Sequence, residues 1–90
     1  MTELLYQSDS YLKSFDAVVT GVDAGNRAVI LDRTAFYPGG GGQPADSGIL
    51  RSDGRVYPVK RARKDGDRVL HLIEGDEPLP APGAAVTGEI

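Results

Sequence analysis

The sequence has no cysteine and no tryptophan, and His71 is its one histidine. Without cysteine the chain forms no disulfide, which suits a reducing compartment. One histidine without cysteine cannot supply the three or four ligands of a zinc site. We therefore expect no metal to be held by this chain alone.

Long apolar runs are also missing. No stretch approaches the ~18 consecutive apolar residues that indicate a membrane-spanning helix. The polar, acidic residues 1–10 lack the apolar core of a signal peptide. The sequence therefore predicts a cytoplasmic protein without membrane contact, and 90 residues predict a single small domain, 1–90.

The net charge is small, at −3, but the charged residues are unevenly distributed along the sequence. Seven of the ten basic residues lie between Arg51 and Arg68, with three acidic ones. A basic stretch on an acidic protein indicates a surface for an anion such as tRNA. An ordinary solvated strand pair is the alternative, because Tyr57 is the one aromatic residue there for base stacking. The candidate tRNA-binding residues are Lys60, Arg61, Arg63 and Lys64.

Alternating β-branched and apolar residues are present in six short segments, separated by turn residues such as Asn, Asp and Gly. Pro58 predicts an edge or a bulge in its strand. Apolar residues on both faces of 68–74 predict a central strand. The pattern predicts an all-β barrel or sandwich of six strands, and closing the barrel would remove exposed edges. The segments are 15–22, 27–31, 47–51, 55–63, 68–74 and 84–90.

Residues 34–48 form a long Gly-rich loop that holds five of the twelve glycines. Four consecutive glycines permit a close approach of backbone to a ligand. The loop is not a Walker phosphate loop, because Gln43 and Pro44 stand where Lys and Ser or Thr are needed. A dinucleotide fingerprint is also excluded, since Pro44 and Gly48 discourage the helix that must follow it. A flexible linker is the plain alternative.

The motif Thr34-x-Phe-Tyr-Pro-x-Gly-Gly-Gly-Gln-Pro-x-Asp-x-Gly48 resembles the signature of AlaX-type trans-editing proteins and of the editing domain of alanyl-tRNA synthetase. The likeness continues through Leu70-His71 and the closing Val86-x-Gly-x-Ile90, so it covers nearly the whole chain. It implies a small N-terminal barrel similar to those of translation factors. It also implies hydrolysis of the ester in alanine tRNA mischarged with Ser or Gly, because an alanine pocket cannot reject these residues strongly.

The family's zinc ligands belong to His-x-x-x-His and Cys-x-x-x-His motifs that this sequence does not contain. We therefore expect a fragment, the N-terminal barrel without its C-terminal catalytic domain, that is inactive alone. Zinc is expected in the full-length parent. The chain ends in mid-pattern at Ile90, as a fragment would, while Met1 favours a free-standing editor over a synthetase domain.

The resemblance implies roles for loop residues. Gln43 is the candidate catalytic residue, since a neutral amide there could bond the aminoacyl group or orient water. Thr34 is expected to face the amino-acid side chain, with Gly40, Gly41 and Gly42 packing closely over the substrate. Strand-end and loop-capping roles are the plain alternatives for Thr34 and Gln43.

Three further residues are expected to be structural. Asp46 is interpreted as a carboxylate that braces the loop through backbone N–H groups. His71 is interpreted as a hydrogen-bonded core histidine, and Phe36 with Tyr37 as anchors of the loop on the barrel. The sequence departs from the family pattern at Ser47, usually Thr, and at Gly39, usually acidic.

Three alternatives remain for the function. The first is a stand-alone RNA-binding β-barrel module, which the basic stretch motivates. The second is the same domain within a full alanyl-tRNA synthetase. The third is a plain structural or interaction barrel.

Overall fold

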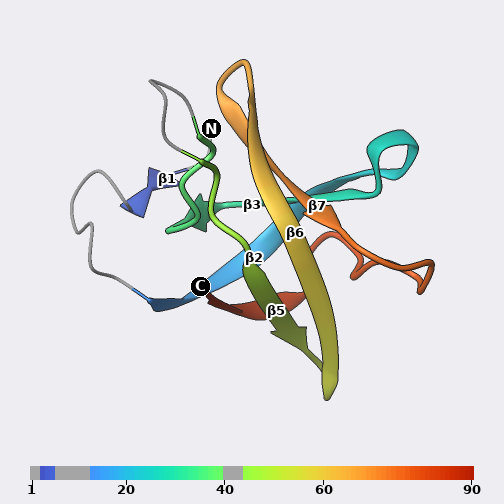
Figure 1. Ribbon diagram of the computed structural model, residues 1–90. Coiled ribbons are helices and arrows are strands. Elements are labelled where there is room, and N and C mark those ends of the chain that lie inside the picture. Colours follow the sequence, from blue (N-terminus) through green and yellow to red (C-terminus); the bar gives the residue numbers. More distant parts are fainter. Residues whose placement is uncertain (1–2, 6–12, 40–43) are drawn as a thin grey trace.

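The structure is a computed structural model that describes residues 3–5, 13–39 and 44–90. Six strands form a closed barrel in which every neighbouring pair is antiparallel (Figure 1). Their order around the barrel is β2-β3-β7-β6-β5-β8. This confirms the all-β, six-stranded prediction and selects the barrel over the sandwich. The bounds are β2 Ser14–Asp23, β3 Ala28–Leu31, β5 Gly48–Ser52, β6 Arg55–Asp65, β7 Arg68–Ile73 and β8 Ala85–Glu89.

Two very short strands lie outside the barrel. β1 (Glu3–Leu4) pairs in parallel with β4 (Arg33–Thr34), and Leu4 lies opposite Thr34. Neither strand was predicted from the sequence, because two residues are too few to show a strand period. The pairing brings the start of the described chain beside the start of the Gly-rich loop.

The β2–β3 connection is a 3-10 turn, Ala24–Asn26. Asp23 caps it by accepting from the Asn26 backbone N–H at 3.2 Å. Arg27 follows in the left-handed region with φ 53°, so the returning strand begins at Ala28 and not at Arg27 as predicted. The β6–β7 turn is likewise shorter than predicted, because β6 continues through Lys64 to Asp65.

Pro58 lies within a strand that has neighbours on both sides, so the predicted edge is wrong and the bulge is right. The β6–β7 register shifts between Val59 and Arg61. The Pro58 carbonyl accepts from Glu74 N at 2.9 Å, just beyond the end of β7. A strand residue directs its N–H and C=O to the same side, so the donor that proline lacks falls at the end of this ladder.

The barrel interior holds the main core, with Phe15, Val29, Leu50, Val59 and Val69 among its buried members. A second buried cluster joins the other faces of β3 and β7, and it comprises Ala28, Ile30, Leu70 and Leu72. Both faces of β7 are therefore buried, which confirms the prediction of a central strand.

At two glycines, β8 and a neighbouring strand approach too closely for a side chain, β5 at Gly48 and β2 at Gly88. A Cβ on Gly48 would overlap the Glu89 carbonyl oxygen, and a Cβ on Gly88 would lie 2.5 Å from the Phe15 ring. Phe15 of β2 is the register partner of Gly88, and its ring fills the space that a side chain at residue 88 would need. These two glycines let the barrel close beside the Gly-rich loop.

Candidate functional site

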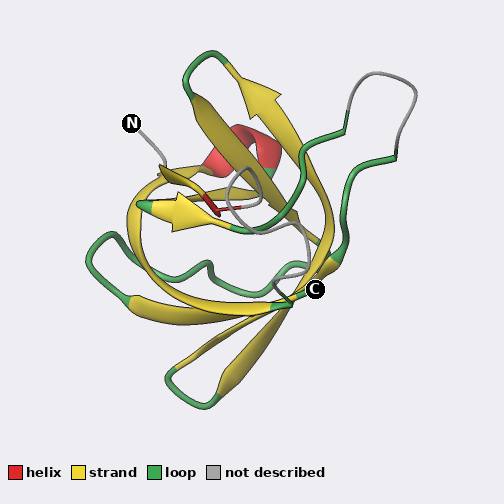
Figure 2. Ribbon diagram, turned by 90° about the vertical axis from the view of Figure 1, so that its left-hand side faces the viewer, coloured by secondary structure: helices red, strands yellow, loops and turns green. Residues whose placement is uncertain are grey.

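The Gly-rich loop follows β4, which lies outside the barrel, and joins the barrel at β5. Its two described arms, 35–39 and 44–47, run side by side away from the barrel (Figure 2). Tyr37 N donates to Asp46 Oδ2 at 2.9 Å, and Asp46 N donates to the Tyr37 carbonyl at 2.8 Å. Ala62 N on β6 donates to the Asp46 carbonyl at 3.2 Å. We call the Tyr37–Asp46 pair the neck clamp.

The neck clamp confirms that Asp46 braces the loop through a backbone N–H. The N–H that Asp46 accepts belongs to Tyr37, nine residues earlier on the opposite arm of the loop, so the contact is not a local Asx turn. A carboxylate that accepts a backbone N–H forms a charge-assisted hydrogen bond, which is stronger than a neutral one. The clamp therefore fixes where the segment between its two residues begins and ends.

Gly39, where the family pattern is usually acidic, has a positive φ of 85°. A Cβ added there would lie 3.3 Å from Ala45 N on the opposite arm. Both the backbone angle and the close approach of the arms favour glycine at this position. The departure from the family pattern thus has a structural reason in this chain.

Thr34 and His71 meet in the core although 37 residues separate them. Both are fully buried. Thr34 Oγ1 lies 2.7 Å from His71 Nε2, and Phe36 N donates to the same Oγ1 at 3.0 Å. On the other side of the ring, His71 Nδ1 lies 2.9 Å from the Val29 carbonyl. Consecutive hydrogen bonds therefore link four groups beside the base of the loop, namely the Phe36 N–H, the Thr34 hydroxyl, the His71 ring and the Val29 carbonyl.

Burial lowers the pKa of His71 to about 4, and the smaller effect of the Val29 carbonyl raises it. The ring is therefore neutral near pH 7. Its edge-on contact with Phe36, at 5.3 Å between ring centroids and 81° between planes, adds aromatic packing. The structure confirms His71 as a hydrogen-bonded core histidine and Phe36 as a buried anchor of the loop.

The structure places only part of the predicted site. Gln43, Gly40, Gly41 and Gly42 lie outside the described residues. Thr34 lies at the base of the loop, next to His71 and Phe36, and its hydroxyl has no exposed surface. The pairing of Thr34 with His71 was not predicted, because no local spacing links residues that far apart in sequence.

The candidate tRNA-binding residues all lie on β6 and are exposed. Lys60 and Arg61 occupy the bulge, and Arg63 and Lys64 follow after the inward-facing Ala62. Within the described part of the chain, none of the four forms an ion pair. Their charges are therefore not neutralised by neighbouring carboxylates there.

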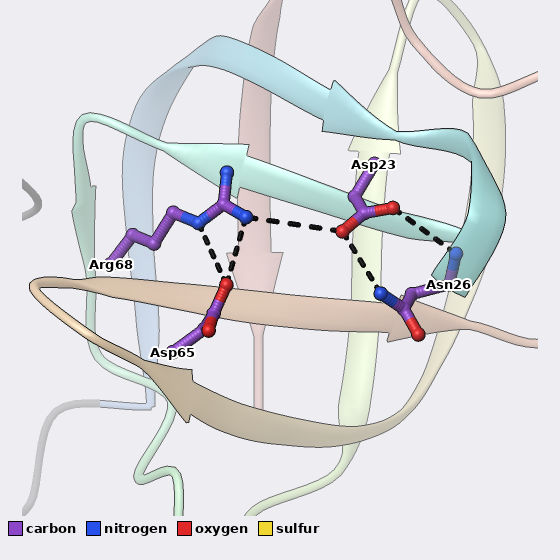
Figure 3. Close-up of polar contacts among 4 residues, drawn as sticks. All are labelled: Asp23, Asn26, Asp65 and Arg68. Carbon is purple, nitrogen blue, oxygen red and sulfur yellow. Dashed lines mark hydrogen bonds and ion pairs between the residues drawn. The ribbon is translucent and has the colours of Figure 1, made fainter.

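Two other basic residues of the same stretch are paired. Arg51 Nε lies 2.6 Å from Glu89 Oε2. Arg68 Nη2 lies 2.8 Å from Asp65 Oδ2 and 3.9 Å from Asp23 Oδ2, so it links the β6–β7 turn to the β2–β3 turn (Figure 3). The same Asp23 accepts from Asn26, and these hydrogen bonds are the main reason its pKa is lowered. Arg68 serves to hold two hairpins together.

A zinc ion does not fit the described residues. Among residues 3–5, 13–39 and 44–90 no group of three His, Cys, Asp or Glu side chains lies close enough together to hold a metal. Both ring nitrogens of His71 already have partners in the core. Any zinc chemistry in a longer protein must use ligands from outside this part of the chain.

A surface hollow of about 780 Å³ is lined by residues of β2, β8, the β5–β6 turn and the segment 32–33 before the loop. Its polar lining includes Arg33, Arg55 and Asp53, and the exposed Val18 and Val56 supply apolar surface. No predicted site residue lines it. No local sequence pattern indicated this hollow, because its walls come from four separate segments.

No helix in the described ranges is both long and apolar enough to cross a membrane.

Comparisons with known proteins show the family of the chain. Residues 6–90 match the family of tRNA synthetases class II (A), and the chain belongs to this family. The chain is 44% identical over 89 residues to alanine–tRNA ligase of Pyrobaculum calidifontis, and 47% identical over 89 residues to that of Korarchaeum cryptofilum. The corresponding identity with the ligase of Pyrococcus furiosus is 46%.

These matches cover 99% of this chain but only 9–10% of each ligase. The chain therefore spans about a tenth of the length of the curated relatives it matches. All three relatives are ligases, so the comparisons favour the synthetase-domain alternative over a free-standing AlaX-type editor.

Proposed function

We propose that this chain is the barrel part of an alanyl-tRNA editing domain, whose loop 34–48 takes part in hydrolysis of alanine tRNA mischarged with Ser or Gly. The observation that carries the proposal is the neck clamp on the family motif. Tyr37 and Asp46 hold the two arms together, and Asp46 is tied to β6. A plain linker needs no such reciprocal hydrogen bonds.

In this proposal Gln43 is the catalytic residue of the loop segment. Its amide can donate to the ester carbonyl and accept from water, and it carries no charge that would repel a cation. Gly40, Gly41 and Gly42 leave room for the aminoacyl group. The remaining chemistry, including zinc in the parent protein, comes from a C-terminal catalytic domain, since the described residues offer no metal site.

Thr34 is proposed to contact the amino-acid side chain. Its hydroxyl is fully buried, so a ligand reaches it only when the atoms that cover it move. Buried polar groups discriminate well between substrates, because a ligand without the matching group leaves them without a hydrogen bond. The burial of Thr34 therefore suits a role in selecting serine.

The test of the catalytic role is a chimaera in which this chain replaces the 89 matched residues of the Pyrobaculum calidifontis ligase. We expect the chimaera to deacylate seryl-tRNA(Ala), and the 90-residue chain alone to show no deacylation. Gln43→Ala should lower the deacylation rate by about 100-fold, the effect of removing one carbonyl-stabilising donor.

The matched control is Gln7→Ala, which removes the chain's other glutamine, outside the loop. We expect Gln7→Ala to keep full deacylation and both variants to keep the zinc content of the chimaera. Equal rates for the two variants would contradict the role of Gln43. A chimaera that aminoacylates tRNA but never deacylates seryl-tRNA(Ala) would refute the proposed function itself.

The second candidate, an RNA-binding module, is favoured by the unpaired cations of β6. If Arg63 contacts a phosphate, Arg63→Gln should weaken tRNA binding and reduce the slope of log K against log salt by about 1. Arg51→Gln is the matched control, because Arg51 is paired with Glu89. We expect it to change neither quantity. Titrations of the 90-residue chain with tRNA at several salt concentrations measure both, and no binding at low salt would exclude the module.

A further inference from the structure

The orientation of the Thr34 hydroxyl follows from its hydrogen-bond partners. A carbonyl oxygen has no hydrogen, so the 2.9 Å contact between His71 Nδ1 and the Val29 carbonyl requires a proton on Nδ1. In a neutral imidazole the other nitrogen, Nε2, then carries a lone pair. The geometry thus selects one tautomer of His71.

The same reasoning assigns the hydrogen of Thr34. An unprotonated Nε2 accepts, so the hydroxyl 2.7 Å away donates its one hydrogen to it. The Phe36 N–H, at 3.0 Å, occupies one of the two lone pairs of Oγ1. One lone pair remains, and no hydrogen is left to donate.

We propose that His71 is a positioning residue that makes Thr34 an acceptor-only group, so that a ligand contacting Thr34 must bring a hydrogen-bond donor. The inference rests on the proposed function, in which Thr34 meets the aminoacyl side chain. The seryl hydroxyl supplies such a donor. A side chain of similar size with only an acceptor, or with no polar group, leaves the remaining lone pair of Thr34 unpaired, and this selects against it.

The first test needs no substrate. Nuclear magnetic resonance of the 15N-labelled 90-residue chain at pH 7 reports which ring nitrogen of His71 carries the proton. We expect protonated Nδ1 and unprotonated Nε2. Thr34→Val should change the Nε2 signal by removing its donor, and Thr34→Ser should restore it. Protonation at Nε2, or an Nε2 signal that ignores Thr34→Val, overturns the positioning role.

The second test uses two matched substrates with the chimaera, seryl-tRNA(Ala) and 3-fluoroalanyl-tRNA(Ala). Fluorine replaces the hydroxyl at the same position but cannot donate. We expect deacylation of the seryl substrate to be faster by about tenfold, the effect of one hydrogen bond. Thr34→Val should abolish this ratio, and Thr34→Ser should keep it.

The variant His71→Asn tests whether His71 must orient the Thr34 hydroxyl or whether the presence of that hydroxyl is sufficient. Its amide can still reach the Val29 carbonyl but is too short to orient Thr34, so the ratio should fall several-fold although Thr34 is unchanged. An unchanged ratio, or equal rates in the unmodified chimaera, overturns the inference. If the chimaera deacylates neither substrate while it still aminoacylates, the proposed function fails, and the resonance of His71 alone decides whether Thr34 is acceptor-only.

Discussion

At the scale of the residue, His71 shows how one buried side chain serves several neighbours. It joins β7 to β3 through the Val29 carbonyl and joins both strands to the base of the loop through Thr34. Its ring also packs against Phe36. The only histidine of the chain is therefore where the core and the candidate site meet.

This burial makes stability depend on pH. The pKa of His71 is about 4 in the folded chain and near its usual 6.5 when unfolded, so the unfolded state binds more protons between these values. The contribution of the neutral His71 ring to the free energy of unfolding is therefore fully present above pH 6.5, and it falls as the pH is lowered toward 4. The loss is about 3 kcal/mol, from 1.36 kcal/mol for each unit of pKa difference.

Urea unfolding at several pH values between 4 and 7 measures this dependence. The variant His71→Phe lacks the titrating ring and should have a nearly flat profile over the upper part of this range. A wild-type profile as flat as that of the variant would contradict the assigned pKa.

At the scale of the element, the sequence predicted the features that depend on local residue patterns. Alternation and turn residues located the six barrel strands to within a few residues. Asp46 and His71 were interpreted correctly because an acidic loop residue and a histidine flanked by apolar neighbours have familiar structural uses. β1 and β4 were missed, since pairs of two residues have no period. The Thr34–His71 contact was missed because it depends on how distant strands are wrapped.

The close contact of Gly88 on β8 with Phe15 on β2 yields a prediction at the same scale. Gly88→Ala places a methyl group 2.5 Å from the Phe15 ring, and moving that ring disturbs the core. Overpacking of this kind lowers the free energy of unfolding by about 1–3 kcal/mol. The control is Gly25→Ala in the 3-10 turn, where an added Cβ has its nearest neighbour at 3.6 Å. Chemical denaturation of both variants should show a loss for Gly88→Ala only.

At the scale of the whole molecule, the barrel closes through strands from opposite ends of the described chain. β8 pairs with β2 on one side and with β5 on the other. Val86 contributes to the same core as Phe15 and Leu50. The six strands therefore depend on each other, and no subset of them forms a complete core.

Removal of residues 84–90 tests this dependence. The shortened chain loses β8 and leaves β2 and β5 with open edges, so we expect it to lose cooperative unfolding. Circular dichroism during thermal unfolding would show this as a broad, shallow change in place of a sharp transition. Replacement of the half-buried Glu89 by Gln, which keeps the strand, should preserve the sharp transition. A cooperative shortened chain would contradict the account.

The neck clamp also bears on how such a site can change over generations. Because Tyr37 and Asp46 join the two arms and Asp46 also contacts β6, we expect substitutions between them, Gly39 excepted, to leave this pairing of the arms in place. Substitutions there alter what is presented to a substrate while the six strands keep their own contacts. New specificities can thus be sampled in this short segment without placing the rest of the protein at risk of unfolding.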